Sequence, residues 1–160
     1  MAARFAPAHV ALFPPAVRNV LVVANRLQDP RSIAAKLARM HREEPVRIYL
    51  LAVVPAPTGH AMAFLRGIDV KRVLREDGLK LLRPLRDGLD AAGVPYRHDV
   101  EVGRWEETIA AYARERCCKS ILIGDHDIRD TRRLAHLLLR HDAWRIRTRL
   151  IRSGFACEML

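Results

Sequence analysis

Five short runs of apolar residues alternate along the chain with segments in which apolar residues recur at helical spacing. The runs at 17–24, 46–54 and 119–124 are almost continuously apolar, which is typical of strands buried on both faces of a parallel sheet. The run at 96–102 alternates polar and apolar residues and predicts a strand nearer the sheet edge. The run at 145–151 alternates arginine or threonine with apolar residues, and predicts a final strand with one basic face.

Four segments between or after these runs predict helices. The first has Asp29 as its N-cap and Pro30 in its first turn, where the missing N–H has no cost. The second is long, and Pro84 is expected to kink or divide it. The third begins at Trp105, and the fourth covers 130–144. The residues expected on the buried faces include Ile33, Leu37, Met40, Leu74, Leu81, Leu85, Leu89, Ile109, Tyr112, Ala113, Leu134, Leu137 and Leu138.

This alternation of strands and helices predicts an α/β fold. We expect a single domain with a doubly wound, mostly parallel five-stranded sheet and helices on both faces. The length of 160 residues suits one domain with a substantial core. The expected division is an N-terminal arm over 1–16, the α/β domain over 17–152 and a C-terminal tail over 153–160.

The loop after the run at 119–124 is where a binding site is expected. In open α/β sheets, ligands bind outside the carboxyl ends of the strands. Gly124 ends this run, and Asp125, His126 and Asp127 follow it. Three consecutive loop side chains do not all point inward, and no spaced His/Cys pair supports them, so a loop surface is favoured over a metal site. The chain contains no nucleophile elbow, phosphate-binding loop or His-Glu-x-x-His motif, so no catalytic residue is assigned.

The formal net charge of +10 bears on possible partners. Such a surface attracts an acidic protein or a nucleic acid, although a solvated basic face is favoured over either partner. Three cysteines without a C-x-x-C pair favour a reducing, cytoplasmic compartment. No apolar run is long enough for a membrane span. The basic residues that crowd the C-terminal part are Arg129, Arg132, Arg133, Arg140, Arg145, Arg147, Arg149 and Arg152.

Several segments together resemble the universal stress protein family. The run Asn-Val-Leu-Val-Val-Ala-Asn at 19–25 resembles the first strand of that family, and Leu-Leu-Ala-Val-Val-Pro at 50–55 resembles its second. The segments at 93–103 and 106–124 resemble its third strand and its third helix with the fourth strand. The resemblance implies an ATP or AMP site at the strand ends. Its residues here would be Ala24, Asn25, Val53, Val54, Gly124, His126, Asp127 and Arg129.

The chain departs from the nucleotide-binding pattern of that family at four places. The pattern has an acid after the first strand, and the motif Gly, two residues, Gly, nine residues, Gly, Ser or Thr after the fourth. Asn25 replaces the acid, Asp127 replaces the second glycine, and Leu137-Leu138 replace Gly-Ser/Thr. Glycines allow backbone N–H groups to approach phosphate closely, whereas a carboxylate repels it. ATP binding is therefore expected to be weakened or lost.

The leading prediction is a stress-associated, cytoplasmic and non-enzymatic protein. The resemblance also implies a homodimer through the last strand, with Arg145, Ile146, Thr148 and Leu150 at the interface. One alternative is a nucleotide-binding switch or slow ATPase, in which Arg129, Arg132 or Arg133 supplies the hydrogen-bond donors that bind the phosphate groups. Another alternative is a polyanion-binding module that uses the C-terminal arginines.

Overall fold

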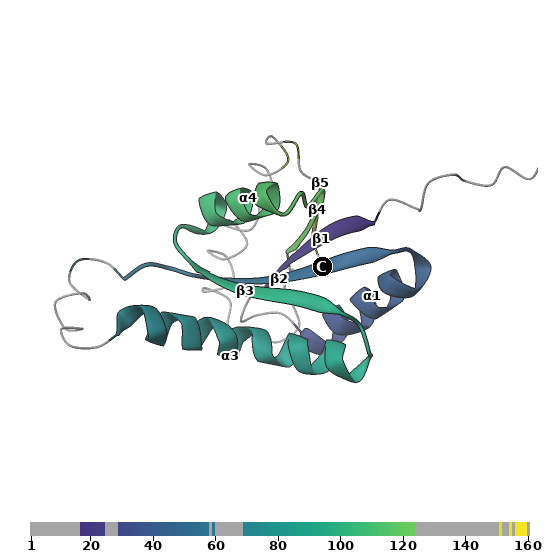
Figure 1. Cartoon of the computed structure of the whole chain (residues 1–160), viewed down its shortest axis with the longest axis horizontal. Coiled ribbons are helices and arrows are strands. Elements are labelled where there is room, and N and C mark those ends of the chain that lie inside the picture. Colours follow the sequence, from purple (N-terminus) through teal and green to yellow (C-terminus); the bar gives the residue numbers. More distant parts are fainter. Residues whose placement is uncertain are drawn as a thin grey trace, which may run out of the picture.

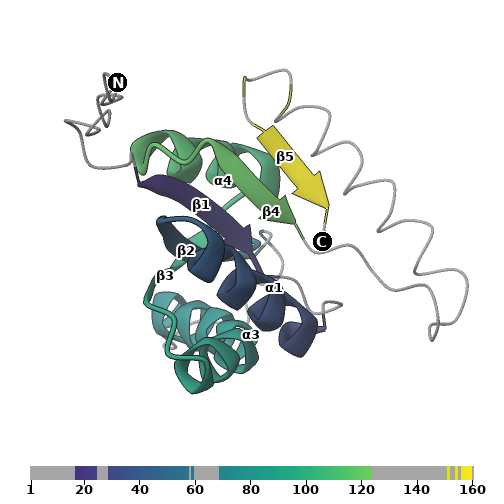
Figure 2. The same ribbon diagram turned by 90° about the vertical axis from the view of Figure 1, so that its right-hand side faces the viewer.

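Five parallel strands form one sheet in the order β3-β2-β1-β4-β5 (Figure 2). The computed structural model describes residues 17–24, 29–57, 59, 69–123, 151, 154 and, for the backbone, 156–159. Every neighbouring pair of strands is parallel. The strands are β1 (Arg18–Val23), β2 (Val46–Val54), β3 (Tyr96–Val102), β4 (Ser120–Ile123) and β5 (Ala156–Met159).

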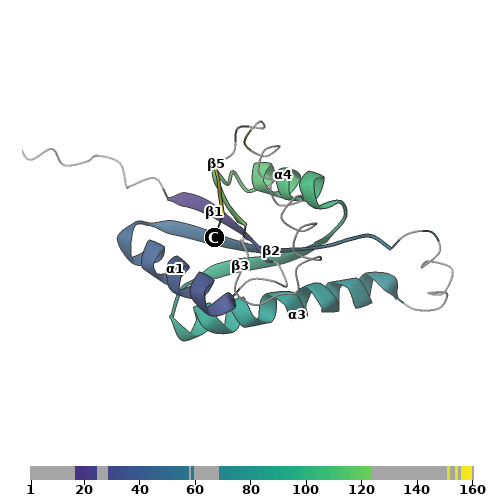
Figure 3. The same ribbon diagram turned by 180° about the vertical axis from the view of Figure 1, so that it is seen from behind.

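Helices cover both faces of this sheet. Helices α1 (Pro30–Glu43) and α3 (Val70–Ala91) lie against one face, and α4 (Trp105–Glu115) lies against the other (Figure 1). Seen from behind, α1 and α3 lie side by side under the sheet (Figure 3). The prediction of a doubly wound α/β fold is confirmed, and so is the prediction that the 96–102 strand lies at an edge.

The core has two layers, because successive residues of a strand point to opposite faces of the sheet. Val20, Val22 and Leu50 pack under α1 and α3, whereas Leu21 and Leu51 pack under α4. All five side chains are fully buried. Burial of each contributes about 1.5–3 kcal/mol to stability, which explains why these runs are apolar at every position rather than at alternate ones.

Two glycines let α3 approach its neighbours closely. A Cβ atom at Gly78 would lie 2.3 Å from Cγ1 of Val100 on β3. A Cβ atom at Gly88 would lie 2.8 Å from the Cβ of Ala34 on α1. Glycine weakens an isolated helix, so its presence at these two positions is explained by the space that any side chain would need.

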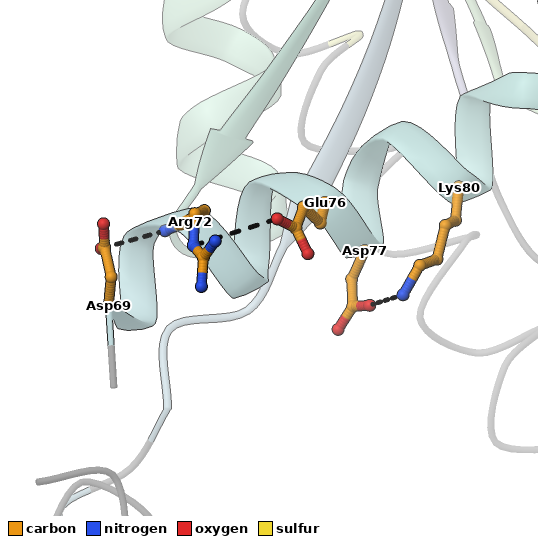
Figure 4. Close-up of polar contacts among 5 residues, drawn as sticks. All are labelled: Asp69, Arg72, Glu76, Asp77 and Lys80. Carbon is orange, nitrogen blue, oxygen red and sulfur yellow. Dashed lines mark hydrogen bonds and ion pairs between the residues drawn. The ribbon is translucent and has the colours of Figure 1, made fainter. Parts of the chain in front are cut away.

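The helices have defined ends. At the start of α1, the Asp29 carboxylate accepts the backbone N–H groups of Arg31 (3.1 Å) and Ser32 (3.3 Å), as the sequence predicts. At the start of α3, the Asp69 carboxylate accepts the backbone N–H of Arg72 over 3.2 Å. Two ion pairs follow along the exposed side of α3 (Figure 4): Arg72 with Glu76 and Asp77 with Lys80.

The end of α3 is a Schellman motif. Val94 donates its N–H to the Leu89 carbonyl over 3.0 Å, and Gly93 donates to the Asp90 carbonyl over 3.1 Å. Gly93 has a φ of 65°, which glycine adopts readily. The predicted helix stop at this glycine is therefore confirmed.

Two sequence predictions differ from the structure. Pro84 does not divide α3, because its ring is exposed while buried leucines on both sides of it hold the helix against the sheet. The fifth strand is Ala156–Met159, inside the segment predicted as a tail, and Ile151, predicted to end the last strand, is helical. A four-residue strand is too short to show the alternation that 145–151 shows. Residues 1–16, 130–144 and 145–150 lie outside the described part of the chain.

Candidate functional site

The strand order defines where a ligand site is expected. The chain passes from β1 outward to β2 and β3, and then returns to β4 on the other side of β1. The crevice at such a switch point lies outside the carboxyl ends of the strands, here β1 and β4. Val23 marks this level, because it pairs with Leu51 on one side and with Ile123 on the other.

The structure places three of the predicted nucleotide-site residues at this end of the sheet. Ala24 follows β1 and is 1% exposed. Val53 and Val54 are the last two residues of β2, and Val53 is buried. The other predicted residues, Asn25, Gly124, His126, Asp127 and Arg129, lie outside the described part of the chain.

β2 extends beyond the last residue of β1. There it directs the Val53 carbonyl toward the side of β2 on which β1 lies. Ala24 donates its N–H to the Leu51 carbonyl over 2.8 Å, so Leu51 faces β1. Alternate residues of a strand direct their backbone groups to the same side, so the Val53 carbonyl also points to this side, beyond the last residue of β1. It accepts a hydrogen bond of 3.2 Å from the indole Nε1 of Trp105. The next carbonyl, that of Val54, accepts the N–H of Gly103 over 3.0 Å.

Trp105 is therefore part of this end of the sheet. The sequence identifies it only as the start of a helix, and it packs against the core under α4. Its hydrogen bond to β2 is a second role that no sequence pattern reveals, because the partner is a backbone carbonyl 52 residues away. Since a carbonyl oxygen has two lone pairs, the indole reduces but does not abolish its capacity to accept from a ligand.

The first turn of α4 adds negative charge beside Trp105. Glu106 and Glu107 follow it directly, and Glu107 pairs with Arg104 over 3.0 Å. Acidic residues at a helix N-terminus compensate the helix dipole. They also make this N-terminus a poor site for a phosphate group, because the positive end of the dipole is already balanced by carboxylates.

A separate polar cluster lies between β3 and α4. The hydroxyl of Tyr112 donates to the Asp99 carboxylate, and the Arg116 guanidinium lies 3.7 Å from the same carboxylate. The guanidinium carbon lies 5.4 Å from the centre of the Tyr112 ring. Burial, together with the hydrogen bond to Asp99, raises the pKa of Tyr112 far above its usual value. The hydroxyl thus stays protonated at neutral pH, and the cluster joins α4 to the sheet.

The other face of β3 carries His98 beside two arginines of α3. Burial lowers the pKa of His98, and the positive charges of Arg86 and Arg75 lower it further. Arg86 also donates from Nε to the Tyr96 hydroxyl over 3.5 Å. His98 is accordingly neutral at physiological pH.

The described residues contain neither a metal-ligand cluster nor a membrane-spanning helix. No group of three or more histidine, cysteine or acidic residues among them is placed to hold a metal ion. None of their helices is both long and apolar enough to cross a membrane.

The geometry at the switch point can be compared with known proteins. The family model for the universal stress protein family matches residues 16–144. The chain belongs to this family. No curated protein matches the chain in sequence.

Solved structures of universal stress proteins share the fold of the chain at low sequence identity. A universal stress protein in complex with cAMP is 15% identical, with a TM-score of 0.61; the match covers 89% of this chain and 96% of that one. One from Archaeoglobus fulgidus in complex with dAMP is 16% identical, with a TM-score of 0.56 and coverage of 89% and 96%. One from Lactobacillus plantarum is 15% identical, with a TM-score of 0.56 and coverage of 89% and 95%.

Proposed function

We propose that this chain is a stress-associated, non-enzymatic universal stress protein of the cytoplasm in which ATP binding is weakened or lost. It acts as a dimer and works through contacts with other proteins rather than through catalysis. The family membership supports the stress-related role. The residues expected around the nucleotide at the carboxyl ends of the strands support the loss of nucleotide affinity.

The observation that carries this proposal is the hydrogen bond between Trp105 and the Val53 carbonyl. This carbonyl is the backbone acceptor that β2 presents beyond the end of β1, and the indole N–H already takes one of its two lone pairs over 3.2 Å, which reduces its capacity to accept from a nucleotide. The sequence adds the absence of an acid at Asn25 and the carboxylate of Asp127 in place of a glycine. Each of these features removes or opposes a contact that an adenine nucleotide would use.

Dimerisation through the last strand follows from the family resemblance. In this structure the last strand is β5, which forms one edge of the sheet. The proposed dimer therefore places β5, rather than the 145–150 segment, at the interface.

Nucleotide binding is the alternative function, and one observation favours it. Related structures carry cAMP or dAMP, and another, from Arabidopsis thaliana, carries AMP. In this alternative, Arg129, Arg132 or Arg133 replaces the missing glycine amides as the phosphate donor, since arginine binds phosphate by a charge-assisted fork.

Isothermal titration with AMP, ADP, ATP and cAMP at millimolar concentration separates the two functions. We expect no saturable heat with the natural sequence. The double variant Asn25→Asp with Asp127→Gly restores the acid and one glycine, and we expect it to gain at least about tenfold in affinity for AMP or ATP, which corresponds to about 1.4 kcal/mol. Micromolar binding by the natural sequence would overturn the proposal in favour of the nucleotide switch.

A further inference from the structure

The outer edge of the sheet at β3 has backbone groups available for pairing. Gly103 donates its N–H to Val54 on β2. Because alternate residues of a strand face the same side, the odd-numbered residues of β3 face β2, and Tyr96, His98, Val100 and Val102 direct their N–H and C=O groups outward. Within the described part of the chain, β3 pairs with β2 alone.

The side chains of β3 on the α4 face carry charges arranged symmetrically about Asp99. Arg97 lies two residues before it and Glu101 two residues after it, and both are exposed. Neither takes part in an ion pair with another described residue. The negative charge of Asp99 is already compensated, because its carboxylate accepts a hydrogen bond from the Tyr112 hydroxyl and lies 3.7 Å from the Arg116 guanidinium.

We propose that β3 pairs antiparallel with β3 of a second copy of this chain, about a two-fold axis at Asp99. In this register Arg97 of each copy lies opposite Glu101 of the other, so both exposed charges gain a partner of opposite sign. Opposite charges directly across a strand pair are favourable. The two sheets would then join into one continuous sheet, with the α3 helices of both copies on the same face.

The direction of the backbone groups agrees with this register. An axis at Asp99 places His98 opposite Val100 and Tyr96 opposite Val102, so the four outward-facing residues of one strand meet those of the other. Arg97 and Glu101 then lie in a non-hydrogen-bonded pair, in which the side chains approach more closely than in a hydrogen-bonded pair. The same pairing covers Val102, which is 43% exposed in the single chain, with Tyr96 of the second copy.

Neighbouring registers are less favourable. An axis at Val100 would place Arg97 opposite Gly103 and Glu101 opposite Asp99, so neither exposed charge would face a partner of opposite sign. An axis at His98 would place Arg97 opposite Asp99, which Arg116 already compensates within its own copy, and would leave Glu101 opposite Pro95 without a basic partner. In the proposed register the two Asp99 carboxylates face each other, but Arg116 neutralises each of them from its own copy.

This interface is separate from the dimer through the last strand. The sheet order places β3 and β5 at opposite edges. Use of both edges would join dimers into larger assemblies, and loss of one interface would leave the other intact. The pairing through β3 also needs no nucleotide.

Charge reversal tests the pairing through its register. Arg97→Glu and Glu101→Arg each place like charges opposite each other, so we expect the apparent mass in sedimentation or native mass spectrometry to fall from that of an assembly larger than a dimer to that of the dimer through the last strand. The double variant exchanges the two charges and should restore the natural mass. A mixture of the two single variants should also reassociate, because one variant then carries carboxylates at both positions and the other carries guanidinium groups at both. Arg31→Glu on α1 is the control for net charge and should change nothing.

A second measurement keeps the test independent of folding defects in the charge variants. The Cα atoms of a non-hydrogen-bonded pair are about 4.5 Å apart, which a disulfide can span. A mixture of Arg97→Cys and Glu101→Cys should therefore form a mixed disulfide that joins the two β3 peptides, and neither variant alone should form it. The proposal would be overturned if both charge-reversal variants kept the assembly mass of the natural sequence. It would also be overturned if the mixture of cysteine variants formed no mixed disulfide.

Discussion

The indole Nε1 of Trp105 donates a hydrogen bond to the carbonyl of Val53 over 3.2 Å, and so joins the first turn of α4 to the end of β2. Trp105→Phe keeps an aromatic ring against the core but leaves this partly buried carbonyl without its donor. We expect a loss of about 0.5–1.5 kcal/mol in the free energy of unfolding, measured by urea denaturation. Tyr96→Phe removes a weaker hydrogen bond of 3.5 Å to Arg86 and serves as the control, with a smaller loss. Equal midpoints for the natural sequence and Trp105→Phe would show that the bond does not stabilise the fold.

Gly78 has no room for a side chain. Its Cβ would lie 2.3 Å from Cγ1 of Val100, so Gly78→Ala forces α3 away from β3 or displaces Val100. Overpacking of this kind costs about 1–3 kcal/mol, which exceeds the gain of about 1 kcal/mol from the better helix propensity of alanine. In the background Val100→Ala both Cγ atoms are absent and the nearest remaining atom of residue 100 is its Cβ at 3.2 Å, so Gly78→Ala should cost much less there. Chemical denaturation of the four proteins measures this coupling, and additive effects would contradict the packing argument.

Cys117 occupies a position that favours glycine. It ends α4 in the same Schellman geometry that Gly93 provides for α3: Cys118 donates its N–H to the Ala113 carbonyl (2.8 Å) and Cys117 to the Arg114 carbonyl (3.1 Å). Its φ is 51°, a left-handed conformation that costs about 1–2 kcal/mol for residues with a Cβ. Cys117→Gly should therefore raise the free energy of unfolding by about 0.5–1 kcal/mol, after the greater flexibility of glycine in the unfolded chain is subtracted.

Gly93→Ala is the matched change in the opposite direction. Its φ of 65° is similar, so alanine there should lower the free energy of unfolding by about 1 kcal/mol. Thermal or urea unfolding in the presence of a reductant measures both variants. A destabilised Cys117→Gly protein would mean that the thiol makes a stabilising contact that outweighs the backbone strain.

Cys118 makes stability depend on pH in the alkaline range. Burial, and to a lesser extent Cys117, raises the pKa of the Cys118 thiol from 9.0 to about 11. Because the folded pKa exceeds the unfolded one, this contribution is complete below about pH 9 and decreases as the pH rises towards about 11, by on the order of 2 kcal/mol. The variant Cys118→Ala has no thiol at this position and therefore lacks this pH-dependent contribution. The difference in unfolding free energy between the natural sequence and this variant should shrink between about pH 8 and about pH 10.5. A free-energy difference that stays constant with pH would contradict the raised pKa of the Cys118 thiol.

Much of the fold follows from sequence, because its local patterns agree with the tertiary structure. The strands predicted at 46–54 and 96–102 coincide with β2 and β3, and Asp29, Gly93 and Trp105 mark helix ends where the sequence predicts them. The two failures have physical causes. Pro84 is tolerated because tertiary packing outweighs the lost backbone hydrogen bond, and β5 is too short for its alternation to be recognised.

The candidate site is less accessible from sequence. The sequence places Ala24 and Val53 together only through the family resemblance, because the pattern of βα units predicts a parallel sheet but not its strand order. The hydrogen bond from Trp105 to the Val53 carbonyl cannot be predicted from the sequence, because it depends on the distance between a side chain and a distant backbone atom. The charges of β3 are visible in the sequence, but their symmetry about a sheet edge has meaning only once the strand order is known.

Native mass spectrometry of gently purified protein, compared with a denatured sample, tests the central claim most directly. We predict that the folded protein carries no nucleotide-sized mass adduct, since Trp105, Asn25 and Asp127 each weaken the binding of an adenine nucleotide. An adduct of that size that disappears on denaturation would contradict it, and would make Arg129, Arg132 and Arg133 the first residues to substitute.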